Sequence, residues 1–125
     1  MNPGKVLEGL DGKDVVSPIE AERGLLAALL QAARDQAETD PSPITEVFGT
    51  DLDWTRIDRA ITAEFKDMVY KFRNEADRLD GGVLEDAVGE MDDRVGVEDW
   101  STQVQETYEE RKDMILEKCT AGGTA

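Results

Sequence analysis

Histidine is absent from this sequence of 125 residues, and cysteine occurs only once, at Cys119. The absence of histidine excludes Ser-His and Cys-His catalysis and most zinc sites. A single cysteine cannot form an intramolecular disulfide. The longest unbroken apolar run, residues 25–30, is too short to span a bilayer. We therefore expect no enzymatic activity, no cofactor, no bound metal and no membrane partner.

The remaining patterns that resemble functional motifs are incomplete. Two glycine pairs lack the flanking residues of a phosphate-binding loop. Asp51 and Asp53 are placed like the first ligands of a calcium loop, but the glycine and the final bidentate glutamate of such a loop are missing. We interpret Asp53 as a helix cap and Cys119 as an apolar residue at a helix end.

Acidic residues outnumber basic residues by 29 to 14, which gives a formal net charge of −15. Valine, isoleucine, leucine and phenylalanine supply only 28 of the 125 residues. That share is just above the level of about 20% below which highly charged chains stay disordered. Repulsion between carboxylates also opposes the compact state. The sequence therefore predicts a thin core that depends on counter-ions, on a partner, or on both.

Lysine and arginine are scattered along the chain, and the sequence contains no basic cluster. Nucleic-acid binding needs such a cluster to displace phosphate counter-ions. We therefore expect no direct contact with nucleic acid or with an anionic membrane. An acidic surface could instead bind a basic protein or imitate DNA, and both alternatives stay open.

The composition resembles that of haloarchaeal proteins, which work in multimolar KCl. Aspartate (15) slightly exceeds glutamate (14), arginine (8) exceeds lysine (6), and histidine is absent. At molar salt the Debye length falls to about 3 Å, so most of the repulsion between carboxylates disappears. The sequence therefore indicates a halophilic system.

Apolar spacing and turn residues predict an all-α fold, a small bundle of three main helices plus one or two short helices, with extended termini. We expect an N-terminal arm (residues 1–16), a helical domain (17–119) and a C-terminal tail (120–125). The main helices are expected at 18–38, 54–79 and 100–119, a shorter helix at 83–94, and a connector at 44–52. In that connector, Ile44, Val47 and Phe48 are expected to cover one end of the core.

Side chains that satisfy free N–H groups mark the expected helix starts. Ser17 with Glu20 forms a capping-box pattern before the first helix. Asp53 and Asp99 are expected to cap the second and third main helices. The glycine pair at 81–82 is expected to end the long helix, and Gly96 the shorter one.

The longest expected helix carries an apolar stripe with spacings of 3-4-4-3-4-4-3 residues. This eleven-residue period predicts a nearly straight stripe rather than a left-handed coiled coil. Its members are Trp54, Ile57, Ile61, Phe65, Met68, Phe72, Ala76 and Leu79. An ungapped similarity at an offset of 46 residues relates Asp53-Trp54-Thr55 to Asp99-Trp100-Ser101, but the apolar stripe is not repeated. We interpret that similarity as coincidence.

The last helix is too polar for the centre of a core, so we expect it to face a partner or to lie at the periphery. The first helix is the most hydrophobic element, and it belongs either to the core or to a subunit interface. Aromatic residues are over-represented at such interfaces. The expected interface residues are Trp100, Val104, Tyr108, Ile115, Leu116, Leu26 and Leu30.

These observations predict a non-enzymatic structural protein of a halophilic system. The specific expectation is a virion component, such as a head–tail connector or adaptor of a tailed haloarchaeal virus, which binds other subunits and forms a homo-oligomer. The N-terminus shows no secretory segment. We therefore expect the protein in the host cytoplasm during assembly and then in the virion. The alternative is a soluble acidic regulator or inhibitor, either a DNA mimic or a helical protein-binding cofactor.

Overall fold

The computed structural model describes the backbone of residues 16–124 and the side chains of residues 16–119. Five α-helices and one 3-10 turn make up this part of the chain, which confirms the all-α prediction. They are α1 (Pro18–Thr39), α2 (Ser42–Phe48), α3 (Trp54–Ala76), α4 (Gly81–Val95), the turn η2 (Val97–Asp99) and α5 (Thr102–Thr124). Apart from Val16, the expected N-terminal arm lies outside the described residues.

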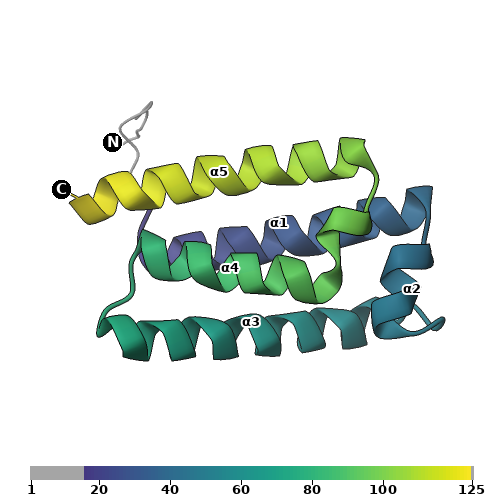
Figure 1. Ribbon diagram of the computed structural model, residues 1–125, viewed down its shortest axis with the longest axis horizontal. Coiled ribbons are helices and arrows are strands. Elements are labelled where there is room, and N and C mark those ends of the chain that lie inside the picture. Colours follow the sequence, from purple (N-terminus) through teal and green to yellow (C-terminus); the bar gives the residue numbers. More distant parts are fainter. Residues whose placement is uncertain (1–15, 125) are drawn as a thin grey trace, which may run out of the picture.

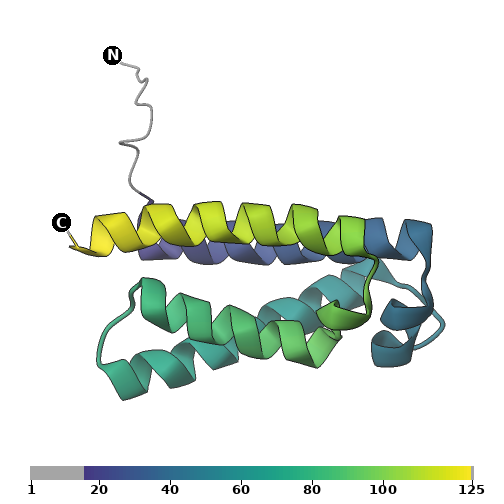
Figure 2. The same cartoon turned by 45° about the horizontal axis from the view of Figure 1, so that its top comes forward.

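The helices α1, α3, α4 and α5 lie together as a bundle in which successive members run in opposite directions (Figure 1). α1 packs most extensively on α5, and α3 on α4, so the bundle consists of two helix pairs (Figure 2). α4 also contacts α5, and α1 also contacts α3. The short α2 lies at the end of the bundle where α1 ends and α3 begins. Because α4 contributes fully to the packing, four helices build the bundle, and not three main ones.

Side-chain hydrogen bonds fix the starts of α1 and α3. Ser17 Oγ accepts a hydrogen bond from the backbone N–H of Glu20 at 3.2 Å. The carboxylate of Asp53 accepts hydrogen bonds from the N–H groups of Thr55 at 3.1 Å and Arg56 at 3.4 Å. Both caps agree with the prediction, because a side-chain oxygen satisfies N–H groups that the first helical turn leaves free.

The boundary between α3 and α4 differs from the prediction. α3 ends at Ala76, three residues before the expected end at Leu79. Asp77 ends it by adopting a left-handed conformation with φ of 57°, which aspartate tolerates better than most residues. The glycine pair at 81–82 does not end a helix but opens α4, because Asp80 accepts a hydrogen bond from a first-turn N–H at 3.1 Å. The carboxylate cap therefore decides where α4 begins.

The start of α5 also differs from the prediction. Asp99 belongs to η2, and Ser101 is the residue that precedes α5 and caps it, accepting from a backbone N–H at 3.4 Å. Trp100 therefore lies before the helix that it was expected to begin, whereas Trp54 is the first residue of α3. The two similar Asp-Trp segments thus have different local structures.

Two further segments are more helical than expected. The connector contains α2, in which Ile44 is fully buried as expected, but Val47 is 44% exposed. α5 continues to Thr124, so the residues expected to form a separate tail after Cys119 extend the helix.

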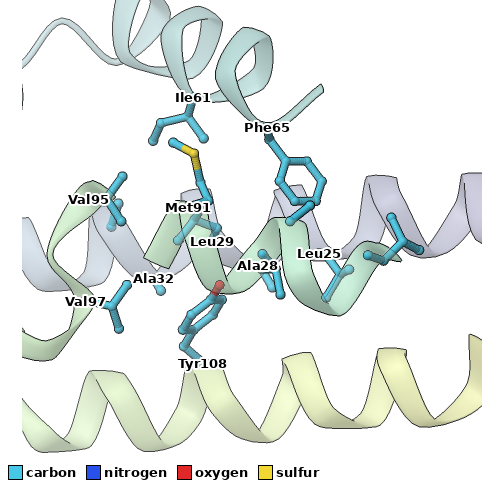
Figure 3. Close-up of a cluster of buried hydrophobic side chains, with 14 of the residues drawn as sticks. Leu25, Ala28, Leu29, Ala32, Ile61, Phe65, Met91, Val95, Val97 and Tyr108 are labelled. Atoms are coloured by element: carbon cyan, nitrogen blue, oxygen red, sulfur yellow. The ribbon is translucent and has the colours of Figure 1, made fainter. Parts of the chain in front are cut away.

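The core contains side chains from every long helix of the bundle. Phe65 from α3 and Tyr108 from α5 reach one cluster from opposite sides, and Leu25 and Leu29 from α1 lie between them (Figure 3). Phe65 and Tyr108 are each only 1% exposed. The stripe predicted for α3 is buried over its middle part, which comprises Ile57, Ile61, Phe65 and Met68, while Ala76 near its end is exposed.

A buried glutamine joins the end of α1 to the start of α5. The Oε1 atom of Gln36 accepts a hydrogen bond from the N–H of Ser101 at 2.7 Å, and its Nε2 donates to the carbonyl of Asp40 at 2.8 Å. Because both ends of the amide are bonded, its burial leaves no polar group without a partner. The sequence does not mark Gln36, since a glutamine in a helix usually faces solvent.

Candidate protein-interaction surfaces

The structure divides the seven expected interface residues into two groups. Four are buried within the chain's own core: Trp100, Val104, Tyr108 and Leu116 are 3%, 9%, 1% and 8% exposed. These side chains offer no surface to a partner, because the apolar stripe of α5 packs into the bundle despite the polarity of that helix. Leu26, Leu30 and Ile115 are only partly buried. The interface prediction therefore rests on these three.

Leu26 and Leu30 lie along the seam between α1 and α3. Glu22 on α1 forms an ion pair with Lys66 on α3, with 2.8 Å between Oε1 and Nζ. Three helical turns further along α1, the guanidinium carbon of Arg34 lies 5.4 Å from the centre of the aromatic ring of Trp54 on α3. Residues spaced by four share one helix face, so the two leucines, at 26 and 30, lie between these contacts.

The outer side of α3 carries a basic stripe. Arg59, Lys66 and Arg73 are spaced by seven residues, so they lie on one face of the helix, and all three are exposed. Tyr70 lies between them in the sequence and is 64% exposed. Arg23 and Arg34 are exposed on the neighbouring α1. We call this surface the α1/α3 face, and it comprises Ile19, Arg23, Leu26, Leu30, Arg34, Arg59, Lys66, Tyr70 and Arg73.

The basic residues are thus less scattered on the surface than along the chain. All seven lysines and arginines of α1 and α3 are exposed. Four carboxylates on the same helices are only partly exposed, and each is bonded to a side chain of the same chain: Glu22 to Lys66, Asp35 to Gln31, Asp58 to Thr62 and Glu64 to Arg94. Four other carboxylates of these helices are exposed and are not among the residues that define the α1/α3 face: Glu20, Glu38, Asp67 and Glu75. Helical periodicity therefore gathers on the α1/α3 face basic residues that are distant in sequence, although α1 and α3 as a whole carry eight carboxylates against seven basic residues.

A strongly acidic surface covers α4 and α5. On α4 the exposed carboxylates are Glu85, Asp86, Glu90 and Asp93. On α5 they are Glu106, Glu109, Glu110, Asp113 and Glu117. We call this surface the α4/α5 face. It lies on the opposite side of the bundle from the seam between α1 and α3, because α1 packs on α5 and α3 packs on α4.

A partly buried polar cluster links α4 to α5. Asp92 accepts a hydrogen bond from the hydroxyl of Tyr108 at 2.6 Å and forms an ion pair with Lys112 at 2.8 Å. The Lys112 ammonium also lies 5.1 Å from the centre of the Tyr108 ring. Burial raises the pKa of Asp92, while Lys112 and Tyr108 oppose that shift. Burial and the nearby Asp92 raise the pKa of Tyr108, so the tyrosine stays protonated. Asp92 is therefore a partly buried, bonded carboxylate, unlike the exposed Asp93 beside it.

Removing the cation from this cluster should weaken folding in a pH-dependent way. We expect Lys112→Met to cost roughly 2 kcal/mol of unfolding free energy at pH 7, because Asp92 is left as an unpaired, partly buried charge. Loss of Lys112 also raises the pKa of Asp92 further. With a raised pKa, Asp92 binds a proton more readily in the folded state than in the unfolded chain. The loss of unfolding free energy should therefore become smaller as the pH falls through that pKa. Urea titrations between pH 4 and 8 measure this change.

Two variants control the measurement. Lys118→Met removes a cation from the same helix, and it should cost less and show no such pH dependence. Asp92→Asn combined with Lys112→Met should recover part of the stability at pH 7, because it removes the unpaired charge. A deficit of Lys112→Met that stays constant with pH would contradict the role assigned to Asp92.

A shallow hollow of about 400 Å³ lies between α1 and α5. Small residues of α1, among them Gly24 and Ala27, face Ile115, Met114 and Arg111 of α5. Met114 is 52% exposed there. Its apolar lining makes the hollow a second area where a partner could bury surface.

The remaining side chains with potential chemical roles are those of Cys119 and Trp100. Cys119 is buried, and burial raises the pKa of its thiol. Trp100 is also buried, and its indole N–H has no hydrogen-bond partner within the described part of the chain. Within the same residues, the side chains form no cluster of three or more potential metal ligands. No helix in that region has the length and apolarity needed to cross a membrane.

The chain was compared with protein-family models, with curated proteins and with solved structures, and none of the three comparisons gave a match.

Proposed function

We propose that this chain is a non-enzymatic assembly protein that works by binding other protein subunits, its own copies included. The observation that carries this proposal is the α1/α3 face, where Ile19 and Tyr70 are 62% and 64% exposed beside the half-buried Leu26 and Leu30. Aromatic and aliphatic side chains grouped with arginines are typical of protein interfaces. A subunit that covers this face would add apolar contacts to a chain with a thin core.

We further propose that the assembly belongs to a halophilic system, and specifically to the virion of a tailed haloarchaeal virus, where the chain would act as a head–tail connector or adaptor. The net charge of −15 and the preference for aspartate and arginine support the halophilic part. The helical bundle supports the adaptor part by analogy alone, since many functions share this fold.

Size-exclusion chromatography with light scattering in about 2–3 M KCl tests the assembly function. We expect a discrete oligomer whose population rises with protein concentration. The hydrophobic contacts of the α1/α3 face remain effective at high salt, where repulsion between acidic copies is screened. A strict monomer at all concentrations would count against an assembly subunit.

The α4/α5 face favours a second candidate function, a soluble acidic regulator. Nine exposed carboxylates on two neighbouring helices could imitate the phosphates of DNA or bind a basic protein. Such a regulator would remain monomeric in the light-scattering experiment, and it would compete with DNA for a DNA-binding protein.

A further inference from the structure

We propose that the α1/α3 face of one copy binds the α4/α5 face of a second copy, so that the chains join head to tail. This inference rests on the proposed assembly function and names the partner of its interaction surface.

The two faces have opposite charge and rows of similar length. Arg59 and Arg73 are fourteen residues apart on α3, which corresponds to roughly 21 Å along the helix axis. Glu106 and Glu117 are eleven residues apart on α5, which corresponds to roughly 17 Å. The difference is less than one helical turn. The basic row of one copy can therefore lie along the acidic row of another.

The other ways of pairing two copies bring like charges together. If two α1/α3 faces met, their arginines would lie opposite each other, and if two α4/α5 faces met, their carboxylates would do so. Like charges placed opposite each other across an interface cost several kcal/mol. Only a contact between the α1/α3 face of one copy and the α4/α5 face of another pairs opposite charges. Charge therefore favours a head-to-tail contact.

The basic side chains needed for this contact are available. Arg23, Arg59 and Arg73 are exposed and form no ion pair with other residues in the range 16–119. Tyr70 lies between Lys66 and Arg73 and supplies an exposed aromatic anchor within the row. The acidic residues of α5 are likewise exposed.

Salt has two different effects on this contact. Each copy carries a net charge of −15, so at low salt two copies repel each other before their faces meet. Concentrated KCl screens that long-range repulsion, whereas charge pairs that become partly buried at the contact are screened much less. Association is therefore compatible with high salt, although its specificity comes from charge.

The position of the faces determines the form of the assembly. They lie on opposite sides of the bundle, so a bound copy leaves one face free for the next copy. Contacts of this kind form a ring when the rotation between subunits closes and a filament when it does not.

Charge-reversed variants test the contact by light scattering in about 2–3 M KCl. The basic-face variant is R23E/R59E/R73E, and the acidic-face variant is E106K/E110K/E117K. Each variant alone should lose self-association by roughly tenfold or more, because its contact now opposes like charges. A mixture of the two should form a complex, because the native α4/α5 face of the first variant can bind the native α1/α3 face of the second. Circular dichroism verifies that both variants fold.

The control variant K71E/R78E/K118E changes the net charge as much as the basic-face variant does, but at positions that belong neither to the two faces nor to the lining of the hollow between α1 and α5. It should associate like the wild type. An oligomer that withstands R23E/R59E/R73E, or variants that do not recombine when mixed, would overturn the head-to-tail contact and leave the assembly function intact. A monomeric wild type would overturn both. If a monomeric wild type binds a DNA duplex through Arg23, Arg59 and Arg73, the α1/α3 face serves nucleic acid instead.

Discussion

Transfer from about 3 M to about 0.1 M KCl should unfold this protein, with loss of most of its helical circular-dichroism signal. The physical reason is the concentration of carboxylates on the α4/α5 face. At about 0.1 M salt the Debye length is about 10 Å, so neighbouring carboxylates on one helix repel each other. With only 28 valine, isoleucine, leucine and phenylalanine residues in 125, the core has little hydrophobic energy to oppose that repulsion.

A neutralised variant provides the control for this prediction. Glu106→Gln, Glu110→Gln and Glu117→Gln together remove three charges from the exposed side of α5 and keep the size of each side chain. We expect this variant to stay helical at lower KCl than the wild type does, because its repulsion is weaker. If the wild type keeps the same helicity and melting temperature at both salt concentrations, the acidity is not a salt adaptation. The acidic regulator would then be the better interpretation.

The second large effect is expected from Phe65→Ala. Phe65 is 1% exposed and lies in the cluster that joins α1, α3, α4 and α5 (Figure 3). Its truncation removes a large buried ring and leaves a cavity between helices that can close only in part. We expect a loss of roughly 3–5 kcal/mol of unfolding free energy. Denaturant titration followed by circular dichroism in high KCl measures it.

Tyr70→Ala is the matched control, because it removes an aromatic ring from the same helix at a position that is 64% exposed. Its effect on the stability of the monomer, measured at a protein concentration at which light scattering shows no association, should stay within about 0.5 kcal/mol. A cost below about 1 kcal/mol for Phe65→Ala would mean that the α3 stripe does not pack as described. Comparable losses for the two variants would contradict the assignment of inner and outer faces.

Local patterns in the sequence predicted much of the secondary structure. The caps at Ser17 and Asp53 and the helix end at Gly96 depend on residues close together in the chain, so they can be read without the fold. The buried middle of the α3 stripe was equally accessible, since helical spacing decides which residues share a face. The errors at Asp77, Asp80 and Ser101 concern boundaries where several polar residues compete to end or cap a helix.

The interface prediction shows what local patterns could not reveal. Trp100 and Tyr108 were assigned to a partner because α5 is polar, but both are buried within the chain. Their burial depends on contacts with α1 and α4, which are far away in sequence. The same is true of Gln36, whose buried amide bonds the backbone of Ser101. Only the packed bundle brings these groups together.

The sequence by itself determined that this protein is acidic, helical and poor in apolar residues, because composition and periodicity are properties of the chain alone. Tertiary structure decided how the charges are distributed. It placed the exposed arginines of α1 beside those of α3, gathered nine carboxylates on α4 and α5, and buried Asp92 against Lys112. The physical reason is that a net charge sums over all residues, whereas recognition depends on which side chains remain exposed together once the apolar stripes have packed.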